Sequence, residues 1–217
     1  MIVAVDGPAA SGKGTLARRL AAHLGYAHLD TGKLYRAVGH AVLDAGDDPE
    51  DAAAAVRAAK SLRVESLGDP ALLGDAAAAA ASKVAAIPCV RAALLQFQQD
   101  FAQNPPGGAA GAVLDGRDIG TVVCPGAEAK LFVTAEVAVR AERRHKELIG
   151  RGQPSIYAQV LQDLKERDAR DSNRAVAPLR PARDAKILDT SALDPDAVFA
   201  AALAHIEERR SEDAATR

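Results

Sequence analysis

The sequence contains no tryptophan, and aromatic residues make up only 3% of its 217 residues. Surfaces that bind single-stranded nucleic acid stack successive bases on aromatic side chains, so this scarcity argues against a nucleic acid polymer as partner. An excess of charge is missing too, because 27 Lys and Arg stand against 29 Asp and Glu, for a net charge of −2. This balance gives no overall attraction to nucleic acid or to a membrane surface.

Cysteine is equally rare, since Cys89 and Cys124 lie far apart and form no Cys-x-x-Cys pair. Isolated cysteines of this kind are typical of buried thiols in a reducing compartment. The five histidines show no metal-ligand spacing. No apolar run is long enough to span a bilayer, and the chain opens on a strand pattern instead of a signal peptide. We therefore expect a cytoplasmic protein with no membrane partner, forming one domain over residues 1–217.

The first apolar run leads into a glycine-rich loop. Met1-Ile-Val-Ala-Val-Asp6 is followed by Gly7-Pro-Ala-Ala-Ser-Gly-Lys-Gly-Thr15, and leucines then recur every four residues. A strand, a glycine loop and a helix in this order place backbone N–H groups around phosphate oxygens. Lys13 can reach the outer phosphates, and Thr15 adds a hydroxyl. The strict P-loop pattern has Ser or Thr directly after the lysine, where this chain has Gly14, so Thr15 is a candidate Mg²⁺ ligand and not an assigned one.

Four further segments have the pattern of short strands, at residues 26–30, 112–115, 129–133 and 186–189. Helical patterns separate them, including an alanine-rich run at residues 76–81, and residues 62–65 are a candidate for one more short strand. Five strands that alternate with helices predict an α/β fold, a five-stranded parallel sheet with helices on both faces. Ligands bind such a sheet at the carboxyl ends of its strands.

Three polar clusters follow predicted strands. The first is Asp30-Thr-Gly-Lys-Leu-Tyr-Arg36, and the second is Asp115-Gly-Arg-Asp118. Asp115 can hold Mg²⁺ through a water, because this ion keeps several waters and takes few carboxylates. The third cluster consists of Arg140, Arg143, Arg144, Arg167, Arg170 and Arg174. Alone it would indicate a solvated helix face with acid–base pairs, but beside a P-loop it favours a lid that closes over phosphates and excludes water.

Five motifs, in order along the chain, resemble the bacterial cytidylate kinases within the P-loop nucleoside monophosphate kinases. They are the loop from Gly7 to Thr15, Leu29-Asp-Thr-Gly-x-x-Tyr-Arg36, Ser82-Lys-Val-Ala-Ala-Ile-Pro-x-Val-Arg91, Asp115-Gly-Arg-Asp-Ile-Gly-Thr-Val-Val123 and Arg167-Asp-x-Arg-Asp-x-Asn-Arg-Ala-Val-Ala-Pro178. The resemblance implies a P-loop kinase with a substrate-binding insertion and an arginine-rich lid. It also implies in-line transfer of the γ-phosphate of ATP, with Mg²⁺, to CMP or dCMP in pyrimidine metabolism.

The same resemblance implies roles for individual residues. ATP would bind Gly7, Pro8, Ala9, Ala10, Ser11, Gly12, Lys13, Gly14, Thr15 and Arg143. The acceptor phosphate would lie against Arg36, Arg117 and Arg174. Ser82, Arg91 and Asp118 would read the cytosine, and Tyr35, Arg167 and Asp171 would line the sugar side, with Thr31 also in the CMP site. Catalysis would depend on Lys13, Arg117, Arg167 and Arg174. By the same resemblance we expect a monomer.

The middle of the chain departs from the family pattern. Residues 62–81 are shorter than the family's insertion, and Leu73 stands where an arginine is expected. A sister kinase for AMP, UMP or a small metabolite would share the P-loop and lid, but it is not expected to share Ser82, Arg91 and Asp118. A GTPase switch would need an Asn-Lys-x-Asp sequence, which the chain lacks. A nucleotide-binding module without activity is a further alternative, disfavoured by Lys13 and the lid arginines.

Overall fold

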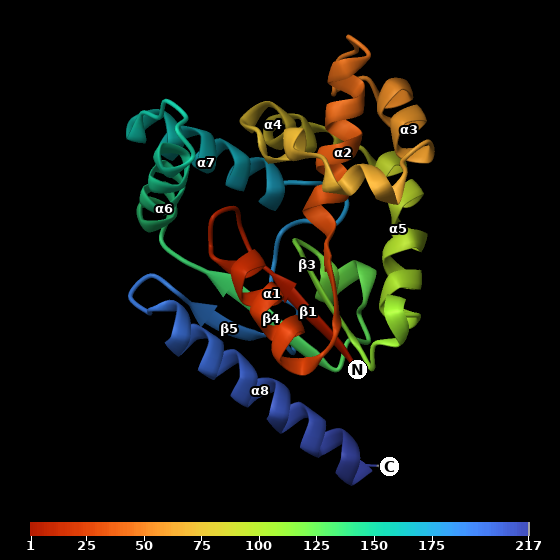
Figure 1. Ribbon diagram of the computed structural model, residues 1–217, viewed down its shortest axis with the longest axis vertical. Helices are drawn as coiled ribbons and strands as arrows, with labels where there is room; N and C mark the ends of the chain where they lie inside the picture. Colours follow the sequence, from red (N-terminus) through yellow and green to blue (C-terminus); the bar gives the residue numbers. More distant parts are fainter. Residues whose placement is uncertain (217) are drawn as a thin grey trace.

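A five-stranded parallel sheet forms the centre of the molecule (Figure 1). In the computed structural model its strands are β1 (Ile2–Asp6), β2 (Ala27–Asp30), β3 (Ala112–Gly116), β4 (Ala129–Thr134) and β5 (Lys186–Asp189), in the spatial order β2-β3-β1-β4-β5. The register places Asp6 beside Gly116, and Asp30 beside Asp115. The structure describes residues 1–216, without the side chains of residue 64 and residues 213–216. The predicted fold class is confirmed.

Helices cover both faces of this sheet. The α-helices in the described residues are α1 (Lys13–Leu24), α2 (Thr31–Asp44), α3 (Ala52–Lys60), α4 (Asp75–Val84), α5 (Pro88–Gln103), α6 (Val137–Gly150), α7 (Tyr157–Ser172) and α8 (Pro195–Thr216). On one face, Val3, Val5 and Leu131 pack against α1 and α8. On the other, Ala4 and Leu114 pack against residues of α5. This alternation follows from the two-residue period of a strand, which sends successive side chains to opposite faces.

Two smaller apolar clusters lie beyond the carboxyl ends of the strands. Helices α2, α3, α4 and α5 pack together around Leu34, Val38 and Val90. Helices α6 and α7 pack around Leu148 and Leu164 and also contact Ala9 of the glycine-rich loop. We call α6 and α7 the lid and α2 to α5 the insertion bundle, and Figure 1 shows them on opposite sides of that loop. The space between them is where the sequence predicts ligand binding.

Two local predictions need correction. Residues 62–65 form no strand, because a 3-10 helix, η1 (Val64–Gly68), begins there, followed by a second one, η2 (Pro70–Leu73). The turn is closed locally, since the Ser66 hydroxyl and amide both donate to the Arg63 carbonyl. Cys89, expected to be a buried thiol, is exposed, whereas Cys124 is buried. The loop after β3 contains a one-turn π-helix, η4 (Ile119–Val123). Such turns are rare and occur frequently at functional sites.

No single helix among the described residues is long and apolar enough to cross a bilayer. One broken pair, Asp75–Val84 with Pro88–Gly108, passes by length and composition only, and it is bent by 102°.

Candidate active site

The glycine-rich loop between β1 and α1 has the backbone shape of a phosphate cradle. Gly7 has φ +154°, and a Cβ there would lie 2.0 Å from the Val133 carbonyl oxygen, so only glycine fits between the strands. Gly12 has φ +89° and caps α1, which begins at Lys13. The first N–H groups of α1 have no partner within the helix, so they are free to bind an anion.

Lys13 and Ser11 place reactive polar groups in this cradle. The pKa of Lys13 is lowered to about 7. Burial is the largest cause and the charge of Arg117 acts in the same direction, while Asp115 and Asp30 oppose the change. A phosphate beside the amine would favour its charged form. The Ser11 hydroxyl is fully buried and has no hydrogen-bond partner among the described residues. Both groups are suited to a ligand with many acceptor oxygens.

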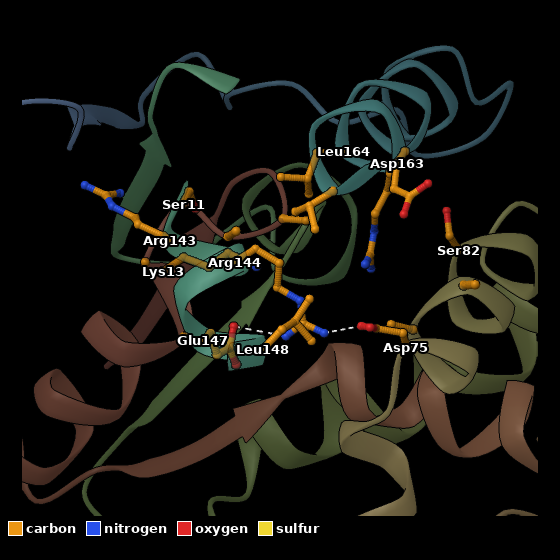
Figure 2. Close-up of a pocket in the computed structure, with 18 of the residues that line it drawn as sticks. Ser11, Lys13, Asp75, Ser82, Arg143, Arg144, Glu147, Leu148, Asp163 and Leu164 are labelled. Atoms are coloured by element: carbon orange, nitrogen blue, oxygen red, sulfur yellow. Dashed lines mark hydrogen bonds and ion pairs between the residues drawn. The ribbon is translucent and has the colours of Figure 1, made fainter. Parts of the chain in front are cut away.

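A cavity of about 730 Å³ opens above this loop and is lined by the loop, α4, α6 and α7. We call it the large cavity, and its size is typical of a ligand pocket. Its walls include the loop residues from Ala9 to Thr15, and Gly7 and Pro8 precede them at the end of β1. The charge on the walls is mostly positive, from Lys13, Arg18, Arg36, Arg143, Arg144, Arg167 and Arg170. Figure 2 shows lid arginines and Ser82 of α4 around this space.

Arg143, which lines the large cavity, is held by the segment after β5. One of its nitrogens donates to the Thr190 hydroxyl at 2.8 Å and another to the Thr190 carbonyl at 2.5 Å. The Thr190 hydroxyl in turn donates to the Ser11 carbonyl at 3.2 Å. Arg143 is therefore coupled to the phosphate loop through a residue that the sequence analysis missed, although Thr190 directly follows a predicted strand.

A second cavity of about 50 Å³ adjoins the first, because Ser82 and Arg167 line both. We call it the small cavity. The sequence-predicted acceptor residues that line it are Thr31, Tyr35, Ser82, Arg91, Arg117, Asp118, Arg167, Asp171 and Arg174. These residues come from α2, α4, α5, the loop after β3 and the end of α7. The fold thus brings together segments that are up to 143 positions apart, as from Thr31 to Arg174.

One wall of the small cavity carries a buried ion pair. Arg91 pairs with Asp118, and both side chains are less than a tenth exposed. The Arg91 guanidinium also lies 5.4 Å from the centre of the Tyr35 ring. On the neighbouring wall, Arg170 of α7 donates to the Ser82 hydroxyl at 3.3 Å. A guanidinium and a carboxylate side by side present donors and an acceptor in one plane, which suits the edge of a nucleobase.

Two other arginines that line the small cavity share one carboxylate. Asp171 is almost fully buried and accepts hydrogen bonds from Arg117 and Arg174. The Nε groups of Arg167 and Arg174 are buried without a partner among the described residues. Burial lowers the pKa of Arg167 to about 9, and the charge of Arg117 adds to this. Positive charge therefore exceeds negative charge here, and an anion would satisfy the unpaired donors.

Two predicted acceptor residues are arranged differently from their neighbours. Arg36 lines the large cavity, and its Nη1 donates to the Leu72 carbonyl at 2.8 Å, so the insertion bundle holds it. Burial lowers its pKa, and Arg144 contributes in the same direction. The Thr31 hydroxyl donates its only hydrogen to the Asp115 backbone carbonyl, at 2.9 Å. Thr31 thus joins α2 to β3 at the floor of the small cavity.

Comparison with known proteins accounts for this combination of cavities. Residues 3–208 match the sequence model of the cytidylate kinase family. The chain is 64% identical to the cytidylate kinase of Paramagnetospirillum magneticum, over 96% of this chain and 99% of the relative. It is 63% identical to that of Rhodospirillum rubrum, over 94% of this chain and 95% of the relative. The chain belongs to the cytidylate kinase family.

Solved structures agree with this assignment at the level of the fold. An uncharacterised protein from Eubacterium ventriosum matches with a TM-score of 0.55 and 15% identity, covering 96% of this chain and 98% of that one. A sugar kinase from Janibacter superposes with a TM-score of 0.50 and 16% identity, covering 95% and 94%. At such low identity the likeness concerns only the α/β kinase-like fold.

The candidate metal ligands of this cytidylate kinase family member lie at the base of α1. Asp115 is buried, and its Oδ1 lies 2.8 Å from His28 Nε2. Its Oδ2 lies 3.5 Å from where a Cβ on Gly14 would be, so the second oxygen faces the phosphate loop. The Thr15 hydroxyl accepts a hydrogen bond from Arg18 at 3.3 Å. No group of three or more potential metal-binding side chains occurs among those that the structure describes.

Arg140, a member of the predicted arginine cluster, is buried and joins the Ala9 carbonyl to Asp168 of α7, so it ties the lid to the phosphate loop. Two further side chains that shape the site, His28 and Asp6, were not singled out from the sequence. His28 contacts Asp115 from the edge strand β2, and its only signal in the sequence was a polar residue in a short, partly buried strand. Asp6, the last residue of β1, also bonds to the loop after β3.

Proposed function

We propose that the protein transfers the γ-phosphate of ATP to CMP and dCMP. The observation that carries this proposal is the small cavity, which is lined both by the Arg91–Asp118 pair and by Arg167 and Arg174, whose Nε groups have no partner among the described residues. A nucleoside monophosphate carries, in a single molecule, both groups that these residues can bind: a polar base edge and a phosphate dianion. The small cavity adjoins a large one above a phosphate loop, so donor and acceptor would meet within one enclosed space.

ATP would bind in the large cavity with its phosphates on the loop from Gly7 to Thr15. The N–H groups at the start of α1 and the Lys13 amine would bind the outer phosphate oxygens. Arg143, held by Thr190, would lie at the donor side. Support for this arrangement comes from the Ser11 hydroxyl, which has no partner within the part of the chain that the structure describes, and from the excess of arginine on the cavity walls.

CMP would bind in the small cavity with its base on the Arg91–Asp118 wall. Cytosine has a donor at N4 and acceptors at N3 and O2, so Asp118 would accept from N4 while Arg91 donates to N3 and O2. Ser82 would complete the contact with the base. Tyr35, Arg167 and Asp171 would line the sugar, with Thr31 beneath them.

The acceptor phosphate would lie where the arginines converge, between the two cavities. Arg117 and Arg174 already bond to Asp171, and the charge of Arg167 also acts on this carboxylate. The incoming phosphate would add the missing negative charge. Arg36 would approach from the large cavity. Phosphoryl transfer needs little covalent chemistry from the protein, since alignment and charge stabilisation supply most of the rate. Lys13 and these arginines would stabilise charge on the transferring group, and lid closure would keep water away.

The oxygen donors at the base of α1 fit Mg²⁺, which prefers hard oxygen ligands and retains several waters. Asp115 has one oxygen engaged with His28 and the other facing the phosphate loop, which suits a contact through water. Thr15 would be the second candidate. When bound, the ion supplies positive charge to the β- and γ-phosphates. We further propose that the chain acts as a cytoplasmic monomer with one domain over residues 1–217.

The test is direct phosphorylation by the purified protein. Incubation with ATP, Mg²⁺ and each of CMP, dCMP, UMP, AMP and GMP should yield CDP and dCDP much faster than any other diphosphate. Preferred turnover of AMP would indicate a sister kinase. Binding of nucleotides without any diphosphate formation would indicate a nucleotide-binding module instead.

A further inference from the structure

Asp6 links the strand before the phosphate loop to the loop that follows β3. It is the last residue of β1, directly before Gly7, and its side chain is buried. Its Oδ1 accepts a hydrogen bond from the Ile119 amide and its Oδ2 one from the Gly120 amide, each at 2.8 Å. Two oxygens of one carboxylate therefore hold two successive backbone amides more than a hundred positions away.

These amides need an outside partner because of the local helix geometry. Ile119 and Gly120 open the π-helix η4, and amides at the start of a helix have no acceptor within it. The next turn is closed without Asp6, since the Val122 and Val123 amides bond to the Asp118 carbonyl. Asp118 itself has φ −143° and ψ 25°, outside the helix. Asp6 thus fixes the point at which the chain leaves Arg117 and Asp118.

Burying the Asp6 carboxylate costs free energy, because a charged group loses its hydration. Burial raises the pKa of Asp6 to about 7, although both amide bonds lower it. An apolar side chain in this place would avoid the desolvation of a charge, but it would leave the two buried amides without an acceptor. The position of the bonded amides suggests what the carboxylate does: they directly follow the residues that line the small cavity.

We propose that Asp6 is a positioning residue for acceptor recognition, which holds Arg117 and Asp118 in place through the Ile119 and Gly120 amides. The inference rests on the proposed function, because it assigns the small cavity to CMP.

The phosphate loop has other supports and does not depend on Asp6 in the same way. Backbone bonds join β1 to β3 on one side and to β4 on the other. Thr190 donates to the Ser11 carbonyl and Arg140 to the Ala9 carbonyl. Loss of the Asp6 bonds should therefore disturb the acceptor side more than the ATP side.

The test compares Asp6→Asn with Asp184→Asn. The asparagine keeps one acceptor but turns an NH₂ group toward the other amide, so one of the two bonds is lost. Asp184 is a matched control, since its carboxylate is largely exposed and bonds Lys130, whose stem packs near Gly120. Misplacement of contact groups costs up to about 100-fold. We expect KM for CMP to rise about 10- to 100-fold in Asp6→Asn, with KM for ATP changed by less than about twofold.

A second expectation separates positioning from general stability: the ratio of kcat/KM for CMP over UMP should fall in Asp6→Asn and stay unchanged in Asp184→Asn. An equal rise of both KM values, or an unchanged KM for CMP, would overturn the proposal. If Asp6→Asn does not fold, hydrogen exchange of the wild-type Ile119 and Gly120 amides decides, since rapid exchange at both would also refute it. Wild-type protein that fails to phosphorylate CMP would refute the proposed function instead, which is a different result.

Discussion

Arg144 of the lid forms an ion pair with Asp75, the first residue of α4 in the insertion bundle, and both line the large cavity (Figure 2). A second Arg144 nitrogen bonds to Glu147 on the same helix at 3.0 Å. The pair therefore joins the lid to the insertion bundle beside the large cavity. It lies two positions from Leu73, whose carbonyl accepts a bond from Arg151 at 3.5 Å. The lid thus contacts residues 62–81, the segment that departs from the family pattern, through the Leu73 carbonyl and the Asp75 side chain.

The first prediction concerns closure of this lid. Hydrogen exchange across residues 137–172 should slow when an analogue joining both nucleotides is added, because the phosphates gather the lid arginines. Arg144→Gln should weaken binding of the analogue by up to about fivefold, since a partly exposed ion pair contributes about 1 kcal/mol or less. Lys146→Gln is the control, because Lys146 is exposed and pairs with Glu142 within α6. Exchange that is the same with and without the analogue would argue for a static, solvated helix face.

The second prediction is loss of turnover in Lys13→Ala with the fold retained. Lys13 would balance charge on the transferring phosphate, and removal of one such group typically lowers kcat about 100- to 1000-fold. Thermal unfolding should change little, because burial disfavours the charged form of this lysine in the free protein. Lys165→Ala, on the exposed side of α7, serves as the matched control. A folded Lys13→Ala protein with near wild-type turnover would contradict the assignment of the loop.

The third prediction follows from the pKa of Lys13, lowered to about 7 by burial and by Arg117. A lysine is neutral above its pKa, so in the free protein Lys13 is mostly uncharged at about pH 8. Bound phosphates raise this pKa again, and ATP binding should then take up about one proton. Calorimetry in two buffers of different ionisation enthalpy would measure the uptake. Lys13→Met should abolish it, and equal binding enthalpies in both buffers for the wild type would refute the prediction.

Most of the fold could be predicted because its signals are local. Val3 and Val5 alternate with Ile2 and Ala4, Gly25 ends α1 in the left-handed conformation, and Pro88 opens α5. Residues 62–65 failed as a strand because the Ser66 turn closes the backbone before any neighbouring strand can pair with it.

The site was less accessible to sequence reasoning, because its contacts are long-range. The motifs identified the candidate acceptor residues, but they did not predict that Arg36 donates a hydrogen bond to the Leu72 carbonyl. Asp6 and Gly120 are 114 positions apart, and His28 and Asp115 are 87 apart. Only the register of β1, β2 and β3 makes them neighbours, and no local pattern in the chain encodes it.

The last prediction concerns base choice, for which the structure gives Asp118 a partner in Arg91. Cytosine presents a donor at N4 to the carboxylate and an acceptor at N3 to the guanidinium. Uracil reverses both groups, so O4 would face the carboxylate oxygens and N3–H would face an arginine donor. Opposed polar groups in a buried site discriminate far better than shape does between isosteres.

Asp118→Ala should therefore lower kcat/KM for CMP sharply and for UMP much less. A well-made polar pair to a base edge contributes about 1–3 kcal/mol, so the CMP/UMP ratio should narrow about 5- to 150-fold. Removing the carboxylate also leaves Arg91 buried without its partner, which destabilises the fold. Asp118→Asn is the companion variant. Its side-chain carbonyl keeps an acceptor for N4, so this variant should retain more of the CMP/UMP preference than Asp118→Ala. If Asp118 merely supports Arg91, both substrates suffer equally, and an unchanged CMP/UMP ratio in folded protein would refute the base-reading role.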